Sequence, residues 1–463
     1  MKKIVITLLI LIIVLIGAFL FFGGDDSVNS LQSFVAFDSE DSCSDPSQAL
    51  KLTHHVGIDV GGENAFEPYA MTSVNNSPFF DYDKKGRLHF VWVNDSNEIV
   101  LQSEDAKNSS WSDEVFYSSS EGYTLINPSL RIVDGDFHIA WLEWDKPKKP
   151  KRSKVMYAKG NGHEWDVREL DEDTFQPKYL AFTVAGSGDE AEPLIAFTTS
   201  FGLDEKAYLY NSRGRVQEES LQSGLTDYLK SSDVALDSIG DRVILTWEEE
   251  LPNQIDGPGD FLVFQISEDK GVTWSDPAYL LGFDDSGEFI HDMGGDPSIC
   301  LTDEAAFIAY QMPRNDKDGS GPYAVTVVAG MPTGGDHFSV IEFDGDEYIG
   351  AGWLPSIDCE GNQFTVAWES SKGRIKEKGD DQIEVAYGEV EWSKDGEIAD
   401  LDYILGPLSG ADINDQTIYD VVANVSMDPN SKDVNVFWTR VDLKEDALSI
   451  HHREDEFGEY YCR

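Results

Sequence analysis

Short runs of alternating hydrophobic and polar residues recur along most of the chain. Each unit starts at a Pro-Ser-like pair, passes a turn with Gly or Asp, and ends in an apolar strand closed by an aromatic residue. The clearest starts are Pro78, Pro128, Pro297 and Pro355. The closing aromatic residues, in chain order, are Trp92, Trp141, Phe197, Trp247, Tyr310, Trp368 and Trp438. Alternation with a period of two predicts half-buried strands, and no long helical periodicity competes with it.

Two further strands follow each aromatic residue. After a variable polar loop comes a third apolar strand, for example at residues 261–264 and 383–387, and then a fourth, outer strand. Four strands per unit, repeated at intervals of about 50 to 70 residues, predict the blades of a β-propeller. A row of β-sandwiches is the alternative, but it would not restart with the same pattern at this interval. The sequence therefore predicts an all-β fold, a propeller of four-stranded blades with seven blades or, as the alternative, six.

Residues 267–274 predict a tight acidic turn between a third and a fourth strand. Asp269 can accept hydrogen bonds from the amides of the turn, and Gly271 allows a backbone conformation that a β-carbon penalises. We expect Trp274 to fold over the turn and anchor it. With Ser267 and Thr273 these residues give the pattern S-x-D-x-G-x-T-W. The pattern resembles the Asp-box, or BNR repeat, of the sialidase-like β-propellers, which implies an architecture more than an activity.

The first residues of the chain have the pattern of a membrane anchor. An apolar run from Ile4 to Phe22 has the length, about 20 residues, that a spanning helix needs. The two lysines before it predict a cytoplasmic N-terminus. A cleaved signal peptide is the alternative, although no cleavage motif follows. We expect residues 1–24 to be a membrane anchor or uncleaved signal, residues 25–47 a flexible acidic stalk, and residues 48–463 a propeller outside the cell.

The acidic composition excludes nucleic acid as a partner. The formal net charge is −51 and the isoelectric point is about 4.2, whereas phosphate binding needs clustered Lys and Arg. Residues 146–154 are the strongly basic run outside the N-terminus, which would either dock an anionic partner or fold back on the acidic surface. The expected partners are a glycan or a cell-surface protein and, through residues 1–24, a membrane.

Four cysteines in an exported chain predict disulfides. Cys300 and Cys359 follow the Pro-Ser-Ile starts of two adjacent units in nearly the same register, so neighbouring inner strands would place them close together. Cys43 and Cys462 flank the propeller. A bond between them would tie the stalk to the last blade and help to close the ring.

Propeller topology places a candidate site on one face. In each blade, the start of the first strand and the loop after the second strand lie at one end, and the Asp-box turn lies at the other. The candidates for catalysis on the first face are Glu143, Glu248, Glu369, Asp292 and Asp296. The candidates for ligand binding are Arg314, Arg440, Tyr348, Trp353 and Tyr419. Aromatic rings with carboxylates suit a carbohydrate, although the plainer alternative is that the whole surface is acidic.

The resemblance to sialidases implies a catalytic set that this chain matches poorly. It implies three arginines that clamp a carboxylate, a Tyr–Glu nucleophile pair, an Asp acid/base and a Phe-Arg-Ile-Pro-like motif before the first blade. Here residues 65–69 read Ala-Phe-Glu-Pro-Tyr, with Glu in place of Arg. By their place in the repeat, Arg87, Arg131 and Arg242 are expected to face away from the pore. Because a bidentate clamp needs Arg, the sequence favours a non-catalytic binding module, with a sialidase-like glycoside hydrolase as the alternative.

No cofactor motif is present. A G-x-S-x-G elbow, an H-E-x-x-H zinc motif and a phosphate-binding loop are all absent from the sequence. Residues 314–319 carry oxygen ligands at alternating positions, which makes Asp316 and Asp318 candidates for calcium. Because the full EF-hand pattern is absent, we expect no cofactor, with calcium as the alternative.

Overall fold

The structure is a computed structural model, and the residues that it describes all belong to one compact unit, Pro46–Tyr460. The described ranges are 50–56, 79–94, 96–105, 110–145, 153–174, 177–201, 204–216, 221, 230–251, 259–280, 295–315, 322–343, 348–371, 381–407, 418–428, 433–442 and 447–456. The predicted anchor, the stalk, Cys43 and Cys462 lie outside the described residues. Within these ranges, no helix has the length and hydropathy that a membrane span requires.

The described strands form seven antiparallel sets of four, which are called sheets one to seven below; the fifth and sixth sets are also joined to each other by a short backbone ladder. The first sheet is β2 (Phe80–Tyr82), β3 (Leu88–Val93), β4 (Glu98–Asp105) and β5 (Ser110–Ser118); the second is β6 (Tyr123–Val133), β7 (Asp136–Asp145), β8 (Ser153–Gly160) and β9 (Trp165–Thr174); the third is β10 (Pro177–Ala185), β11 (Glu192–Phe201), β12 (Asp204–Asn211) and β13 (Gly214–Arg215). The fourth is β14 (Lys230–Ile239), β15 (Arg242–Leu251), β16 (Gly259–Ser267) and β17 (Ala278–Tyr279); the fifth is β18 (Gly295–Leu301), β19 (Ala305–Asn315), β20 (Pro322–Pro332) and β21 (Ser339–Val340); the sixth is β22 (Gly350–Glu360), β23 (Gln363–Ser371), β24 (Asp381–Trp392) and β25 (Ile398–Pro407). The seventh is β26 (Ile418–Met427), β27 (Asp433–Asp442) and β28 (Ala447–Glu456), with β1 (Leu50–Val56) as its outer strand. A short 3-10 helix, η2 (Gly188–Glu190), separates β10 from β11.

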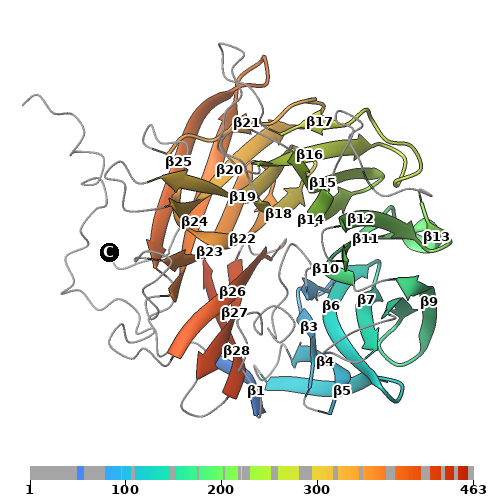
Figure 1. Cartoon of the computed structure of the whole chain (residues 1–463). Helices are drawn as coiled ribbons and strands as arrows, with labels where there is room; N and C mark the ends of the chain where they lie inside the picture. The colour runs from blue at the N-terminus through green and yellow to red at the C-terminus, as the bar shows by residue number, and fades with distance from the viewer. Residues whose placement is uncertain are drawn as a thin grey trace, which may run out of the picture. The chain divides into compact units, whose positions relative to one another are not determined.

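The first strands of the seven sheets follow one another around a ring (Figure 1). In chain order, β2, β6, β10, β14, β18, β22 and β26 each contact the next. The ring closes because Phe437 of β27 packs against Phe79 and Phe80 at the start of the first sheet, with ring centroids 5.5 and 4.4 Å away. Sheets of four antiparallel strands around a central axis define a β-propeller. The predicted all-β fold with four-stranded units is therefore confirmed.

A bulge in the inner strands explains why the units begin with Pro-Ser-like pairs. Asn127, Asp296 and Leu354 have positive φ angles of 48°, 48° and 50°, and each lies at a register shift in its strand. A proline follows each of them, and its fixed φ returns the chain to the extended conformation.

The serines after two of these prolines link neighbouring sheets. The Ser298 hydroxyl accepts a hydrogen bond from the Ile357 amide at 3.0 Å, and the Ser356 hydroxyl accepts one from the Val425 amide at 3.2 Å. These side chains therefore connect one inner strand directly to the next.

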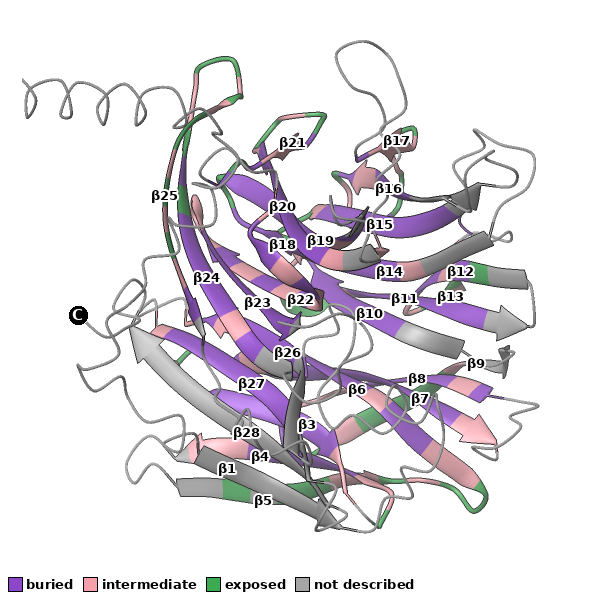
Figure 2. Ribbon diagram, turned by 60° about the vertical axis from the view of Figure 1, so that its left-hand side comes forward, coloured by how far each residue is buried: buried purple, intermediate pink, exposed green. Residues whose placement is uncertain are grey.

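The core lies between the faces of adjacent sheets. Six of the seven closing aromatic residues are fully buried, namely Trp141, Phe197, Trp247, Tyr310, Trp368 and Trp438. Figure 2 shows the buried residues along the inner and middle strands of the sheets. The apolar strand ends that define the repeat in the sequence are thus the residues that pack the sheets together.

The turn at residues 267–274 connects β16 to β17 and has the local hydrogen bonds that the sequence predicts. The Asp269 carboxylate accepts bonds from the amide of Thr273 at 2.7 Å and from its hydroxyl at 2.6 Å. The Ser267 hydroxyl accepts a bond from the Gly271 amide at 2.9 Å, and Gly271 has a φ of 77°. The indole of Trp274 donates to the Gly271 carbonyl at 3.0 Å, so the ring lies over the turn.

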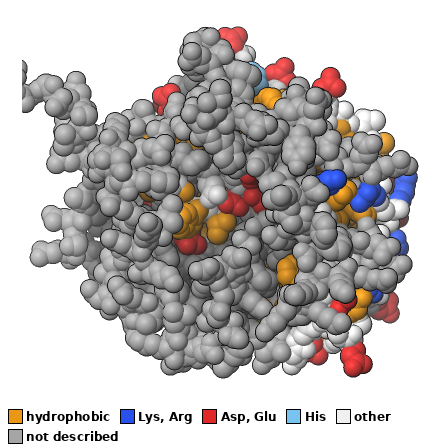
Figure 3. Space-filling model, in the orientation of Figure 1, with side chains coloured by type: hydrophobic (Ala, Val, Ile, Leu, Met, Phe, Trp, Pro, Cys, Tyr) orange, Lys and Arg blue, Asp and Glu red, His pale blue; other side chains and the backbone are white. Residues whose placement is uncertain are grey.

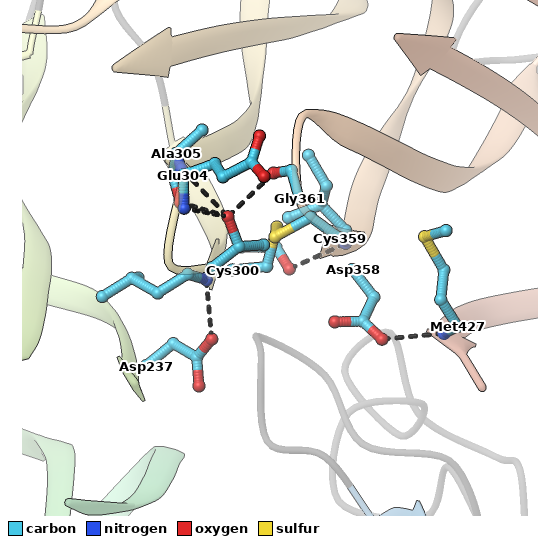
Figure 4. Close-up of a disulfide and its surroundings, with 12 residues drawn as sticks. Asp237, Cys300, Glu304, Ala305, Asp358, Cys359, Gly361 and Met427 are labelled. Carbon is cyan, nitrogen blue, oxygen red and sulfur yellow. Dashed lines mark hydrogen bonds between the residues drawn. A yellow bond between two sulfur atoms is a disulfide. The ribbon is translucent and has the colours of Figure 1, made fainter. Parts of the chain in front are cut away.

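The predicted bond between Cys300 and Cys359 is present (Figure 4). It joins β18 to β22, with a Cα–Cα distance of 5.9 Å, and both residues are buried. The bond therefore links the inner strands of the fifth and sixth sheets.

Candidate functional site

The strand register confirms which ends of the sheets lie together. In the fourth sheet, Lys230 pairs with Glu250 and Leu251 pairs with Gly259, so the start of the first strand and the loop after the second lie at one end. Ser267, where the acidic turn begins, pairs with Val243 at the opposite end. We call the first end the loop face.

Three adjacent sheets place an equivalent residue near the loop face. Glu248, Gln311 and Glu369 each follow directly on the closing aromatic residue of the second strand in sheets four, five and six. We call these three residues, with Gly295, Asp296 and Trp353 of the neighbouring inner strands, the rim site.

Contacts within the rim site join residues of different strands. The indole of Trp353 donates a hydrogen bond of 2.9 Å to Oε1 of Glu369, directly opposite it in the register. In the register of the fifth sheet, Gly295 occupies the place opposite Gln311. A β-carbon at Gly295 would lie 3.0 Å from Oε2 of Glu248, so the carboxylate reaches from the fourth sheet to the fifth. Both glutamates are nearly buried, whereas Asp296, Gln311 and Trp353 are half-buried.

Glu143 lies apart from the rim site. It is two residues beyond Trp141, so strand alternation turns it to the opposite face of its sheet from Glu248 and Glu369. Its carboxylate is fully buried and accepts a hydrogen bond of 2.7 Å from the hydroxyl of Tyr117 on β5. Burial and this bond raise the pKa of Tyr117 above its usual range. This Tyr–Glu pair joins the first sheet to the second.

The remaining predicted site residues are spread over two sheets. Arg440 pairs in register with Asp420, and Tyr419 pairs with Val441, both in the seventh sheet. Arg314 lies in β19 opposite Tyr323, rather than in a loop. Tyr348 is half-buried and packs against the core cluster between the fourth and fifth sheets. Asp292, Asp316 and Asp318 lie outside the described residues.

The expected orientation of Arg131 is wrong. Its guanidinium donates a hydrogen bond of 2.8 Å from Nη2 to Oδ1 of Asp237, which links β6 to β14 although β10 lies between them in the ring. Both residues line a cavity of about 30 Å³ together with Asp358 and Ser426. Arg131 therefore points into the central channel. By contrast, Arg87 bonds to Asp83 within its own hairpin, at 2.6 Å.

Acidic side chains that the sequence did not single out surround Arg131. Asp81, Asp237 and Asp358 each accept a hydrogen bond from a backbone amide of the next sheet, respectively from Ile132 at 2.6 Å, Leu301 at 2.9 Å and Met427 at 2.8 Å. Burial raises the pKa of all three carboxyls, against the attraction of Arg131, and that of Asp358 rises to about 6. The signal in the sequence was an aspartate at a fixed position of the first strand. It lies two residues after the residue that pairs with the one just before the closing aromatic residue.

Two views show acidic groups near the centre of the molecule. Figure 4 shows the carboxylates of Asp237 and Asp358 on either side of a shared space below the disulfide. Figure 3 shows acidic and hydrophobic side chains together near the centre of the face turned to the viewer. Among the described residues, no group of three or more His, Cys, Asp or Glu side chains is placed to hold a metal ion.

Comparisons with known proteins find distant likenesses of fold. No protein-family model matches the chain, and no curated protein sequence matches it. Among solved structures, it is similar to the sialidase of Trypanosoma rangeli, with 10% identity and a TM-score of 0.43 over 80% of this chain and 59% of that one. It is also similar to an α-L-arabinanase of Penicillium chrysogenum complexed with arabinobiose, with 12% identity and a TM-score of 0.42 over 84% of this chain and 99% of that one. A mutant of the Trypanosoma rangeli enzyme that displays trans-sialidase activity matches at 10% identity, with a TM-score of 0.42 over 88% of this chain, which spans 58% of the length of that protein. The assignment of a propeller rests on the strand topology of this chain.

Proposed function

We propose that this protein is a non-catalytic binding module that holds a glycan at its rim site. The observation that carries the proposal is the bond from the Trp353 indole to Glu369, which fixes an aromatic ring at the loop face. A fixed ring contributes apolar contact area at little cost in side-chain entropy. Gln311 and Asp296 are half-buried on the neighbouring fifth sheet and carry the polar groups that a sugar hydroxyl requires.

The state of the acidic groups supports binding rather than hydrolysis. A glycosidase of the usual kind needs two carboxyl groups that flank the scissile bond. Here Glu143 is enclosed between two sheets and bonded to Tyr117, and Glu369 is engaged by an indole. Arg131 is already paired with Asp237, so its guanidinium is not available to clamp a substrate carboxylate.

The wider setting of the module is part of the proposal and rests on the sequence alone. Residues 1–24 would tether the propeller to a membrane, with the rest of the chain outside the cell. The turn at 267–274 would make the chain a relative of the Asp-box propellers.

Trp353→Ala is expected to weaken glycan binding by about 10- to 100-fold, since loss of a stacking ring costs about 1.4 to 2.8 kcal/mol of binding free energy. Glu369→Gln should weaken it much less, because the glutamine oxygen can still accept the indole proton. A glycan array followed by calorimetry on the best ligand measures both. Trp392→Ala is the matched control, because that indole also donates a side-chain hydrogen bond, to Asn362, away from the rim site.

Hydrolysis decides between the two functions that the sequence allows. We expect the unsubstituted chain to hydrolyse fluorogenic sialosides and arabinosides no faster than a blank without protein. Turnover that disappears in Glu248→Gln or Glu369→Gln would reject the binding module and establish a glycoside hydrolase. If no sugar binds and Trp353→Ala changes nothing, the rim site is not a glycan site.

A further inference from the structure

Seven residues hold equivalent register positions on the inner strands, and four of them, Arg131, Asp237, Asp358 and Ser426, line the cavity described above. The position is found in two steps. On each inner strand, one residue pairs with the residue that precedes the closing aromatic residue of the second strand, and the position of interest lies two residues after it. In the first sheet, the same position follows from the bond between the Val91 amide and the Phe79 carbonyl. We call this set the channel layer; it consists of Asp81, Arg131, Thr183, Asp237, Cys300, Asp358 and Ser426.

The channel layer contains three carboxyl groups and one guanidinium. Arg131 bonds directly to Asp237 at 2.8 Å. Asp81 and Asp358 interact with the Arg131 charge through electrostatic attraction, without a direct bond to it. Cys300 is held in the disulfide and does not titrate. If all three aspartates are ionised, the layer carries two negative charges that no cation within it balances, in an environment where charge is costly.

The same carboxyl groups hold the ring together. Asp81 links the first sheet to the second, Asp237 the fourth to the fifth, and Asp358 the sixth to the seventh, each through an amide of the next inner strand. A protonated carboxyl keeps a carbonyl oxygen that can accept the same amide proton. Protonation therefore removes charge from the layer without removing these links.

The groups that act on Asp358 come from three other inner strands. They are the Met427 amide and Ser426 of β26, Asp237 of β14 and Arg131 of β6. Burial and the charge of Asp237 oppose ionisation of Asp358, whereas Arg131, Ser426 and the amide favour it.

We propose that the channel layer is a proton-operated clamp, in which Asp358 takes up a proton in mildly acidic medium and the seven sheets then pack more stably. The sign follows from linkage. A carboxyl whose pKa is higher in the folded chain than in the unfolded chain stabilises the fold on protonation. Stability is gained as the pH falls through about 6, the folded value for Asp358, and the gain is complete below its ordinary value of 3.8.

The test is thermal unfolding of the intact chain between pH 7.5 and 5.0. Asp358→Asn keeps an acceptor for the Met427 amide and removes the charge. We expect it to raise the midpoint at pH 7.5 by about 3 °C and to flatten the rise that the unsubstituted chain shows on acidification. Asp402→Asn removes one charge at an exposed position of β25 and should leave that rise unchanged, which separates the clamp from general relief of the net charge.

Arg131→Gln provides a second variant with a different prediction. Without the cation, the three carboxyl groups repel one another more strongly, so the midpoint should fall most at pH 7.5 and recover on acidification. This variant keeps the proposal testable if Asp358→Asn fails to fold. Equal pH dependence in Asp358→Asn and Asp402→Asn, or a midpoint loss in Arg131→Gln that is the same at every pH, would overturn the clamp.

Discussion

Replacing Cys300 and Cys359 together by serine is expected to lower the free energy of unfolding by about 4 kcal/mol. The disulfide joins residues 59 positions apart, and a cross-link over a loop of that length removes entropy from the unfolded chain worth about 4 kcal/mol in the chain-entropy account. Both residues are buried between inner strands, so the serines also place hydroxyl groups in an apolar cluster.

Urea unfolding of the double variant, compared with the oxidised unsubstituted chain, measures the loss. Mapping of cleaved, non-reduced peptides should first show the Cys300–Cys359 bond. As a control, the unsubstituted chain treated with reductant during unfolding should approach the stability of the variant. A difference below about 1 kcal/mol, with the bond present, would contradict the entropic account.

Phe437→Ala is expected to cost about 3 to 5 kcal/mol, the usual range for a buried phenylalanine. The ring of Phe437 is fully buried and contacts three phenylalanines of the first sheet, Phe79, Phe80 and Phe90. These contacts close the propeller between its last and first sheets. The substitution therefore removes packing at a junction where strands far apart in the sequence meet.

Phe437→Leu is the matched variant, because it retains much of the apolar volume and should lose less than half as much stability. Chemical unfolding followed by tryptophan fluorescence measures both. If alanine and leucine cost the same, or alanine costs under 1 kcal/mol, the seventh sheet does not pack on the first in the way described here.

The repeat in the sequence predicted the parts of the fold that depend on local pattern. The alternation around Trp141 and Trp368 predicted strands, because the hydrophobic period of a strand is fixed by its geometry. The pairing of Cys300 with Cys359 followed from equivalent positions in adjacent units. The turn at Asp269 followed from hydrogen bonds that residues close in sequence make with one another.

The positions of side chains in space were harder to predict because they depend on register. Arg131 was expected to face away from the channel, but the bulge at Asn127 adds a residue and shifts the alternation of the inner strand. Glu143 and Glu248 both follow a closing tryptophan, yet they differ by one position and so lie on opposite faces of their sheets. Counting residues from the closing tryptophan would have placed Glu143 and Glu248 on opposite faces.

The repeat predicted the seventh unit but not its outer strand. Its outer strand is β1, which pairs with β28 from Leu50 opposite His452 to Val56 opposite Ala447. Nothing in a single repeat specifies that a strand before the first unit completes the last one. This is a long-range pairing, and its cost in chain entropy is recovered only when the other sheets are in place.

That pairing sets an order for biosynthesis. The ribosome produces β1 before any complete sheet, and β28, its partner, only after the other six sheets. Until then the nascent chain carries an unpaired strand edge at β1 and an open ring, a state in which β-rich chains aggregate. The ring can therefore close only after the last strands have been synthesised.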